Sequence, residues 1–372
     1  MNGRILGIDA LRGLTMALLA GGASLLQQIL TVCSSEGKLT PAVAAQFRHA
    51  EWGAGFTCWD MVMPLFIFIV GVSVPFALSS YRQRYGEKWR RCTLLRILRR
   101  VVLLFLLGMC VQGHLLNFDA GQLSLFCNTL QAIAVGYLTA ALFQMFSGTR
   151  TQMIACFLML SVYGLLLCFM PYDGHEGGRF LPHDNLAYYI DCSLQGSLQD
   201  GTPYTWILSS LSFGALTLMG ALGGQALRLL TPYRRFPVLI ISGLICLGAA
   251  MAFEPVLPLI KHIFSPTMVL WSGGWCLLLL ALFHLLFDFT PRARFLCLPF
   301  LAFGSNAIAA YLLTQLPGVG GHPLWWGLSK PLVGGFSTLF GESEALVFSA
   351  LSFLMLWGLL EILRRHRCLL RI

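Results

Sequence analysis

The chain has 372 residues, of which 57% are hydrophobic and 11% are charged, and its formal net charge is +9. Soluble domains carry about 25% charged residues, so this composition excludes a soluble globular protein and indicates an integral membrane protein in contact with the lipid bilayer. The positive charge does not indicate nucleic acid binding, because the basic residues gather in short loops between apolar runs, as the positive-inside rule describes.

Apolar runs of roughly 20 residues, each long enough to cross a bilayer as a helix, recur along the whole chain. They are too evenly apolar for the strands of a membrane barrel, in which polar and apolar residues alternate. We predict an all-α fold: a polytopic integral membrane helical bundle of about ten transmembrane helices, forming a single domain over residues 1–372. The approximate limits of the helices are 5–30, 58–80, 97–116, 123–146, 151–171, 204–229, 236–254, 267–288, 295–316 and 345–364.

The loops between these runs alternate in charge. All 25 Lys and Arg residues divide 20 to 5 between the two sides, and the richer side includes both termini. Basic loops stay in the cytoplasm, so we expect both termini there, which agrees with an even number of spans. The loops on the outer side are then 31–57, 117–122, 172–203, 255–266 and 317–344.

The twelve cysteines are scattered, and no two of them have CxxC spacing. Isolated cysteines in apolar runs pack as small hydrophobic residues. Because the chain shows no spacing typical of metal ligands, we expect no metal site.

Two charges lie within the first predicted span. Asp9 and Arg12 are three residues apart, so they share a helix face and can pair. Near the cytoplasmic end of a span, such a pair could orient an anionic ligand, or the two charges could simply neutralise each other.

A histidine and an aspartate flank the start of the second predicted span. His49 precedes this span and Asp60 opens it. Histidine can act as a base or a nucleophile near neutral pH, and a carboxylate that accepts a hydrogen bond from an imidazole fixes its tautomer. The short loop between them could fold back and join the two residues. The alternative is an interfacial histidine and an aspartate that only caps a helix.

A run of basic residues begins in the loop after the second predicted span and continues through Arg96 into the start of the third, where it ends with Arg99 and Arg100. Guanidinium groups bind phosphate well, so the run could attract a nucleotide-bearing cofactor such as coenzyme A. The alternative is a topology signal that contacts anionic lipids.

Two polar residues lie inside apolar runs, Gln131 in the fourth predicted span and Asn306 in the ninth. Asn306 could donate a hydrogen bond to a developing oxyanion, or it could bond to a neighbouring helix. The same two alternatives apply to Gln131.

Two of the outer loops, 172–203 and 317–344, are long and rich in polar and aromatic residues. Aromatic faces stack on apolar faces of sugars, so these loops could form a vestibule for a sugar. Trp325 and Trp326 could belong to it, or they could lie in the aromatic belt at the membrane interface.

Eight segments of the chain occur in the order in which they occur in a known family. They are residues 7–13, 49–53, 60–71, 130–131, 189–191, 258–261, 271–274 and 304–307. On these segments the chain resembles the transmembrane acyltransferase family that includes heparan-α-glucosaminide N-acetyltransferase and its bacterial relatives. The first three segments are the most specific part of the resemblance.

The resemblance implies a membrane-embedded acetyltransferase. The family moves an acetyl group from cytosolic acetyl-CoA to a sugar amine on the far side of the membrane. We therefore expect acetyl-CoA as the acyl donor and an amino-sugar or glycan acceptor on the outer, periplasmic side, acetylated at an amine or a hydroxyl. Family members often dimerise, so a homodimer is one expectation, and the short N-terminus favours the inner membrane of a bacterium over a lysosome.

The resemblance also assigns roles to residues. His49 matches the essential histidine after the first span, Asp60 matches the aspartate that opens the next span, and Asn306 matches a polar position near the site. We expect these three to be catalytic, with Asp60 orienting His49 and Asn306 stabilising the oxyanion. The residues that we expect to bind the donor are Arg96, Arg99, Arg100, Asp9, Arg12 and Gln131.

The chain departs from the family at two positions. Ala23 stands where the family usually has Asn, and Ala132 stands where the family has Arg after Gln131. These departures leave open a diverged acyl specificity, or a loss of activity in a relative that acts only as a membrane partner.

The rival hypothesis is a transporter or flippase for a glycan or a lipid-linked sugar. Ten spans and polar outer loops would serve it equally well. Against it, no internal repeat is convincing, and the halves of the chain do not share discontinuous spans at matching positions, which are typical of many secondary transporters.

Overall fold

The computed structural model of the chain describes residues 5–34, 40–290, 295–318, 322–368 and 370. In these residues the regular structure is helical, and β-structure is limited to isolated bridges. The predicted all-α, polytopic membrane fold is therefore confirmed. Five of the basic residues that the topology prediction uses lie outside the described residues, namely Arg4, Lys38, Arg292, Arg294 and Arg371.

Eight stretches of the described chain are long and apolar enough to cross a membrane, or nine if the bent pair Phe295–Ser305 and Ala307–Gln315 forms one span. The sequence predicts ten spans. The counts differ because the stretch Trp59–Val111, counted here once, contains two helices, α4 (Val62–Tyr85) and α5 (Trp89–Val111). Arg96 of α5 lies over the rings of Tyr81 and Tyr85 in α4, so the chain turns back between the two helices.

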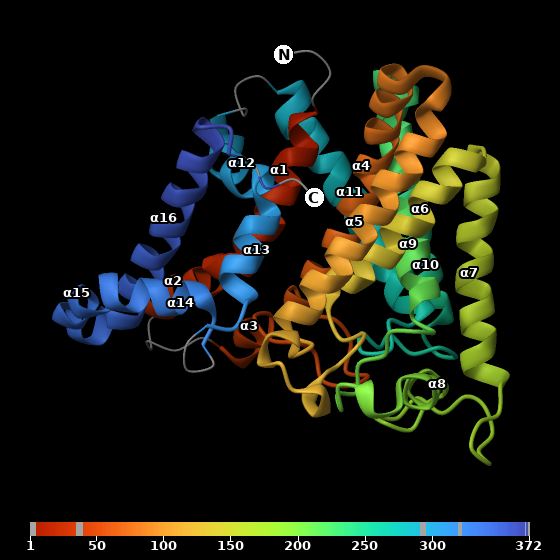
Figure 1. The fold of residues 1–372 in the computed structure, drawn as a ribbon, viewed down its shortest axis with the longest axis horizontal. Coiled ribbons are helices and arrows are strands. Elements are labelled where there is room, and N and C mark those ends of the chain that lie inside the picture. Colours follow the sequence, from red (N-terminus) through yellow and green to blue (C-terminus); the bar gives the residue numbers. More distant parts are fainter. Residues whose placement is uncertain (1–4, 35–39, 291–294, 319–321, 369, 371–372) are drawn as a thin grey trace. The chain divides into compact units, whose positions relative to one another are not determined.

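The helices group into two compact units (Figure 1). The first unit comprises Met1–His49, Thr57–Val62 and Leu282–Arg371, and the second comprises Ala50–Phe56 and Met63–Ala281. In the colours of Figure 1, the first unit carries the red and blue ends of the chain. The N-terminal helices therefore pack with helices from the far end of the sequence.

The second unit is built around one helix, α9. Its helices are α4, α5, α6 (Thr129–Phe146), α7 (Thr149–Phe169), α8 (Leu186–Gln195), α9 (Ser210–Leu229), α10 (Pro232–Phe253) and most of α11 (Pro266–His284). A Cβ added at Gly220 of α9 would lie 2.1 Å from the carbonyl oxygen of Phe68, and one at Gly71 would lie 2.0 Å from that of Thr217. Small residues let helices approach closely in lipid, where the hydrophobic effect does not drive association.

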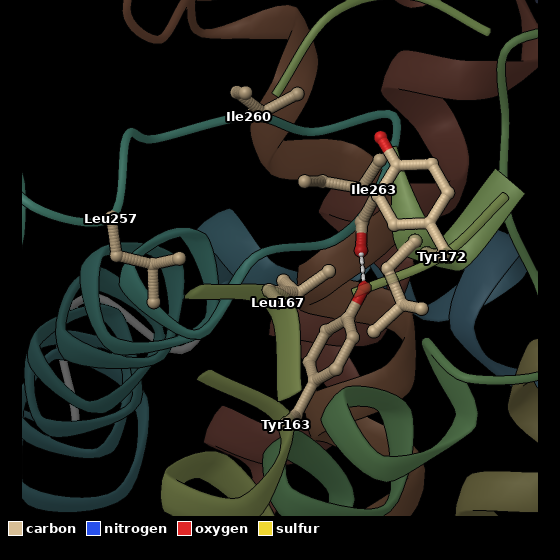
Figure 2. Close-up of a cluster of buried hydrophobic side chains, with 8 residues drawn as sticks. Tyr163, Leu167, Tyr172, Leu257, Ile260 and Ile263 are labelled. Carbon is tan, nitrogen blue, oxygen red and sulfur yellow. Dashed lines mark hydrogen bonds between the residues drawn. The ribbon is translucent and has the colours of Figure 1, made fainter. Parts of the chain in front are cut away.

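A core of buried side chains supports the outer loops of the second unit. It comprises Tyr163, Leu167, Tyr172, Leu186, Ala187, Leu257, Ile260 and Ile263. Figure 2 shows the Tyr163 hydroxyl directed at the carbonyl oxygen of Ile263, to which it donates a hydrogen bond of 2.5 Å. The end of α7 is therefore tied to the loop between α10 and α11.

The first unit pairs the N-terminal helix with a helix near the end of the chain. Its helices are α1 (Leu6–Ala17), α2 (Ala23–Cys33), α3 (Pro41–Ala45), α12 (Leu298–Ser305), α13 (Ala307–Gln315), α14 (Leu324–Ser329), α15 (Gly335–Ser337) and α16 (Glu344–Arg365). A Cβ added at Gly13 would lie 1.9 Å from the carbonyl oxygen of Phe300, and one at Gly304 would lie 2.4 Å from that of Asp9. Glycines on both partners thus set the spacing of α1 and α12.

Two apolar runs of the first unit are interrupted, which the sequence analysis did not predict. A π-helical turn, Leu18–Gly22, separates α1 from α2, and its Gly21 has a φ of 111°. The helices α12 and α13 meet at Asn306 with a bend of 64°. Each interruption comes from one or two residues inside an apolar run, so composition alone gives no signal for it.

Replacing Gly304 by Val should lower the thermal stability of the purified protein, because the side chain would force α1 and α12 apart. Overpacking of this kind costs about 1–3 kcal/mol. The matched control is Gly358→Val in α16, where an added Cβ meets nothing within 4 Å. Equal midpoints of thermal unfolding for the two variants in detergent would contradict the proposed close packing.

Candidate active site

The structure brings His49 and Asp60 together within the first unit. Nδ1 of His49 lies 2.9 Å from Oδ1 of Asp60. The Asp60 side chain is 1% exposed, whereas the His49 side chain is 47% exposed. When the ionised carboxylate accepts the proton on Nδ1, Nε2 carries the lone pair of the neutral ring. We call this pair the dyad.

Thr57 holds the carboxylate of the dyad in place. Its backbone N–H and its hydroxyl lie 3.2 and 2.9 Å from Oδ2 of Asp60, and the backbone N–H of Asp60 lies 3.4 Å from the Thr57 hydroxyl. This reciprocal pattern is that of a capping box. The sequence analysis missed Thr57, although a threonine three residues before an acidic residue and an apolar run is the known signal.

The two ends of the loop that carries the dyad are also joined directly. The Thr57 hydroxyl lies 2.7 Å from the carbonyl oxygen of Arg48. The backbone N–H of Trp59 donates to the carbonyl oxygen of Gln46 (3.1 Å), and that of Cys58 donates to the Gln46 side chain (3.1 Å). The position of His49 against Asp60 therefore depends on local hydrogen bonds.

A second histidine–aspartate pair lies elsewhere in the first unit and was not predicted from the sequence. Nδ1 of His284 lies 2.8 Å from Oδ2 of Asp288, and the Asp288 carboxylate accepts hydrogen bonds from the backbone N–H groups of Leu6 and Gly7. Asp288 thus caps α1, and the His284 side chain is only 3% exposed. Of the two pairs, the dyad is the one whose imidazole can meet a substrate from solvent.

Asn306 does not join the dyad. It is fully buried, and its Nδ2 donates to the carbonyl oxygen of Leu360 in α16 (3.4 Å). Of the two roles that the sequence left open for Asn306, the structure therefore shows the hydrogen bond to a neighbouring helix. Asp9 and Arg12 also pair as the spacing predicts, with 3.8 Å between the carboxylate and the guanidinium.

The three predicted donor-binding arginines have different surroundings in the second unit. Arg96 lies over two tyrosine rings of α4, and Arg99 is exposed. Arg100 lies over the ring of Tyr137 in α6, with 4.5 Å from Cζ to the ring centroid. Its Nε is buried and has no hydrogen-bond partner among the described residues. An arginine with a buried, unfilled donor is a candidate ligand-binding group.

Gln131 has a structural role that accounts for its burial. Its Oε1 accepts hydrogen bonds from the backbone N–H groups of Cys127 and Asn128, and its Nε2 donates to the carbonyl oxygen of Leu125. With Asn128 it forms the capping box of α6. The geometry therefore gives Gln131 a role in the helix cap, and donor binding by this residue stays a prediction.

The tryptophans proposed for a sugar vestibule also differ from each other. Trp325 is buried and donates its indole N–H to Ser352, so it belongs to the interior of the first unit. Trp326 lies against His322, with Lys330 over its ring.

The outer loops of the second unit hold an aromatic stack that the sequence analysis did not identify. The indole N–H of Trp52 donates to the carbonyl oxygen of Phe180 (2.7 Å). The ring of Trp52 stacks on His262, with 4.9 Å between centroids, and Tyr204 lies 4.6 Å from His262. Trp52 thus anchors the residues between His49 and Thr57 to the loops of the second unit.

Asp191 is a buried carboxylate in these loops. It accepts hydrogen bonds from the backbone N–H groups of Trp206 and Ile207, at 2.6 and 3.0 Å. Burial raises its pKa to about 6, against the effect of these two donors. Because the folded chain holds this proton more tightly than the unfolded chain, the stability contributed by Asp191 is full below about pH 4 and is lost as the pH rises through 6.

Two comparisons with known proteins bear on this site. The family described as "Domain of unknown function (DUF5009)" matches residues 4–186, just under half of the chain, and this range includes the dyad. A stretch of 103 residues is 33% identical to heparan-alpha-glucosaminide N-acetyltransferase of Homo sapiens. The chain is similar to both. The second match covers 27% of this chain and only 15% of the human protein.

Together these matches support a relationship to the family named from the sequence, without singling out a member. The human relative is named as an N-acetyltransferase. A polytopic helical fold is compatible with a membrane acyltransferase.

The stability of the wild type relative to Asp191→Asn should be greater at about pH 5 than at about pH 7.5, because only the aspartate changes its protonation in this range. The difference between their thermal midpoints at each pH measures this effect. Asp173→Asn, at an exposed position of the same loop, is the control and should show no such trend. A difference that grows with pH would contradict the raised pKa.

Proposed function

We propose that the chain is a membrane acyltransferase that moves an acetyl group from cytosolic acetyl-CoA to an amine or hydroxyl of a sugar on the outer side. The observation that carries the proposal is the dyad, in which a buried carboxylate held by Thr57 fixes the tautomer of an exposed imidazole. The similarity to an N-acetyltransferase supports it.

In this proposal His49 acts as the base. Nε2 takes the proton of the attacking amine or hydroxyl while the bond from that atom to the acetyl carbon forms. The carbon–sulfur bond then breaks and the imidazolium gives its proton to the sulfur, so the products are an acetylated sugar and a free thiol. Asp60 stabilises the imidazolium while it carries the proton. Alternatively, Nε2 itself attacks the acetyl carbon, and the carbon–sulfur bond breaks to give an acetyl-histidine and a thiolate. The acceptor then takes the acetyl group, Nε2 is freed, and the acceptor's proton passes to the sulfur.

The arginines of α5 serve the donor in this proposal. Phosphates of the nucleotide would pair with Arg96, Arg99 and Arg100, because guanidinium groups form strong charge-assisted hydrogen bonds with phosphate. The buried Nε of Arg100 supports this role. For Asp9 and Arg12 of the first unit, donor binding stays a prediction from the sequence.

One observation favours the alternative hypothesis, a transporter or flippase for a glycan. The two interrupted helices of the first unit are of the kind that forms substrate sites in secondary transporters. Coenzyme A binding separates the two hypotheses, because a glycan transporter has no use for it.

His49→Ala should abolish detectable acetyl transfer while leaving the protein folded, because general-base help alone is worth about 10²–10⁴-fold. Transfer of radiolabelled acetyl from acetyl-CoA to a panel of amino sugars, by purified protein in detergent, is the measurement. His366→Ala, at an exposed position after α16, is the control. Transfer at a tenth of the wild-type rate in His49→Ala would overturn the assignment.

Asp60→Asn should lower the rate by about 10²-fold or more, because an amide cannot stabilise the imidazolium and its N–H groups favour the other tautomer. Thr57→Ser keeps the hydroxyl and should retain most of the activity. The same acetyl-transfer assay compares the two. Equal rates in the two variants would show that the carboxylate has no part in the reaction.

A further inference from the structure

A helical arm joins the bent pair α12–α13 to α16 within the first unit. It comprises α14, a π-helical turn (Lys330–Gly334), α15 and a 3₁₀-helical turn (Thr338–Ser343), and we call it the arm. Figure 1 shows the arm running across the direction of α16. Among the described residues the arm is not a candidate span, although residues 324–341 carry a single charge, Lys330. Its apolar side chains therefore need an apolar environment other than a crossing of the bilayer.

The start of α16 fixes the depth of the arm. α16 has 22 residues and rises about 33 Å, which matches a hydrocarbon layer of about 30 Å. Its first residue, Glu344, therefore lies near one boundary of this layer. The arm ends at the preceding residue and runs across α16, so the arm stays close to that boundary. The charge of the loops predicts that this boundary is the outer one.

One side of the arm is already covered by protein. Trp325, Ser329 and Ser337 are buried, and their spacing of four and eight residues places them on the same side of the arm. The indole N–H of Trp325 donates to the hydroxyl of Ser352 in α16 (3.1 Å). This side therefore packs on the rest of the first unit.

A second line of side chains, one position earlier in the chain, is apolar and exposed. It comprises Leu324, Leu328, Leu332, Phe336 and Phe340, which we call the apolar stripe. Leu332 is 70% exposed and Phe336 is 53% exposed, so the described chain leaves these side chains largely uncovered. Steps of four residues drift slowly around an α-helix, and the wider π-helical turn counteracts this drift. The stripe therefore follows the length of the arm.

A third line of exposed residues is small or polar. It comprises Gly327, Pro331, Gly335 and Thr338, which we call the polar line. A Cβ added at Gly327 or at Gly335 would meet nothing within 4 Å, so this line borders open space. The exposed surface of the arm is thus divided along its length into an apolar and a polar side. A helix divided in this way lies in the plane of the membrane surface, with its apolar side toward the acyl chains.

The one charge of the arm is placed as this orientation requires. Nζ of Lys330 lies 4.4 Å from the centroid of the Trp326 ring, and that ring lies 3.8 Å from the ring of His322. Tryptophan rings gather at the level of lipid headgroups. A lysine there covers apolar surface with its stem and keeps its ammonium group in water. These residues therefore mark the headgroup level on the arm.

The residue types of the apolar stripe favour lipid over a second protein chain as the occupant. Apolar contacts do not drive helix association within a bilayer, because the acyl chains are as apolar as leucine. Close helix contacts in the first unit are made by glycines against backbone carbonyls, as at Gly13 and Gly304. The stripe instead consists of leucine and phenylalanine. Acyl chains are therefore the occupant that fits this surface.

We propose that the arm lies in the surface of the outer leaflet, with the apolar stripe inserted among acyl chains and Lys330 among the headgroups. The arm then holds the start of α16 at a fixed depth. This inference goes beyond the proposed function and does not depend on acetyl transfer.

The first test places the photoreactive residue benzoylphenylalanine at Leu332 of the apolar stripe or at Gly327 of the polar line. The full-length protein is irradiated in vesicles of radiolabelled phosphatidylcholine, and lipid bound to the protein is measured. Position 332 should be labelled as strongly as Phe157, an exposed residue on the span α7, and position 327 several times less. Equal labelling at 327 and 332 would overturn the inference, as would a cross-linked dimer in place of a lipid adduct at 332.

A second measurement uses the wild-type protein and so needs no variant to fold. Vesicles of phosphatidylcholine with a diazirine on one acyl chain are irradiated, and mass spectrometry locates the adducts within residues 322–343. They should fall on the apolar stripe rather than on the polar line. Adducts on both lines alike, or on neither, would overturn the inference. Either result leaves the proposed function untouched, because the readout is lipid contact and not acetyl transfer.

Discussion

Hydrocarbon offers no hydrogen-bond partner to a backbone amide, and the polar residues of this chain are placed to meet that constraint. Asp288 closes the start of α1, Asn128 and Gln131 close the start of α6, and Thr57 and Asp60 form a capping box just before α4. In each case a side chain supplies what the solvent cannot. The candidate active site is one of these helix starts, with an exposed histidine added to it.

This origin explains why the carboxylate of the dyad is buried while its imidazole is partly exposed. One oxygen of Asp60 serves the capping box and the other serves His49, so a buried charge is satisfied on both sides. The comparison with His284 and Asp288 shows that the contact alone does not make a site. There the same atoms meet in the interior, where the imidazole is hidden from solvent.

The sequence was sufficient for the fold class and for the residues of the dyad. Long apolar runs can only be helices in lipid, and a histidine before an aspartate at the start of a span stands out in a chain with few charges. It was not sufficient for the two interruptions at Gly21 and Asn306, because a bend inside an apolar run changes no periodicity. Nor could it decide between the structural and functional roles of Gln131, since a capping box and a ligand contact need the same amide.

The loop that begins at His49 leaves the first unit for seven residues and returns at Thr57, while its two ends remain tied to each other. His49 is thus held by a hydrogen bond within the first unit, whereas residues 50–56 are held by contacts within the second unit, such as that of Trp52. Substitutions in residues 50–56 leave in place the hydrogen bonds that join the two ends of the loop. The seven residues can therefore vary in sequence while the His49–Asp60 contact keeps its geometry.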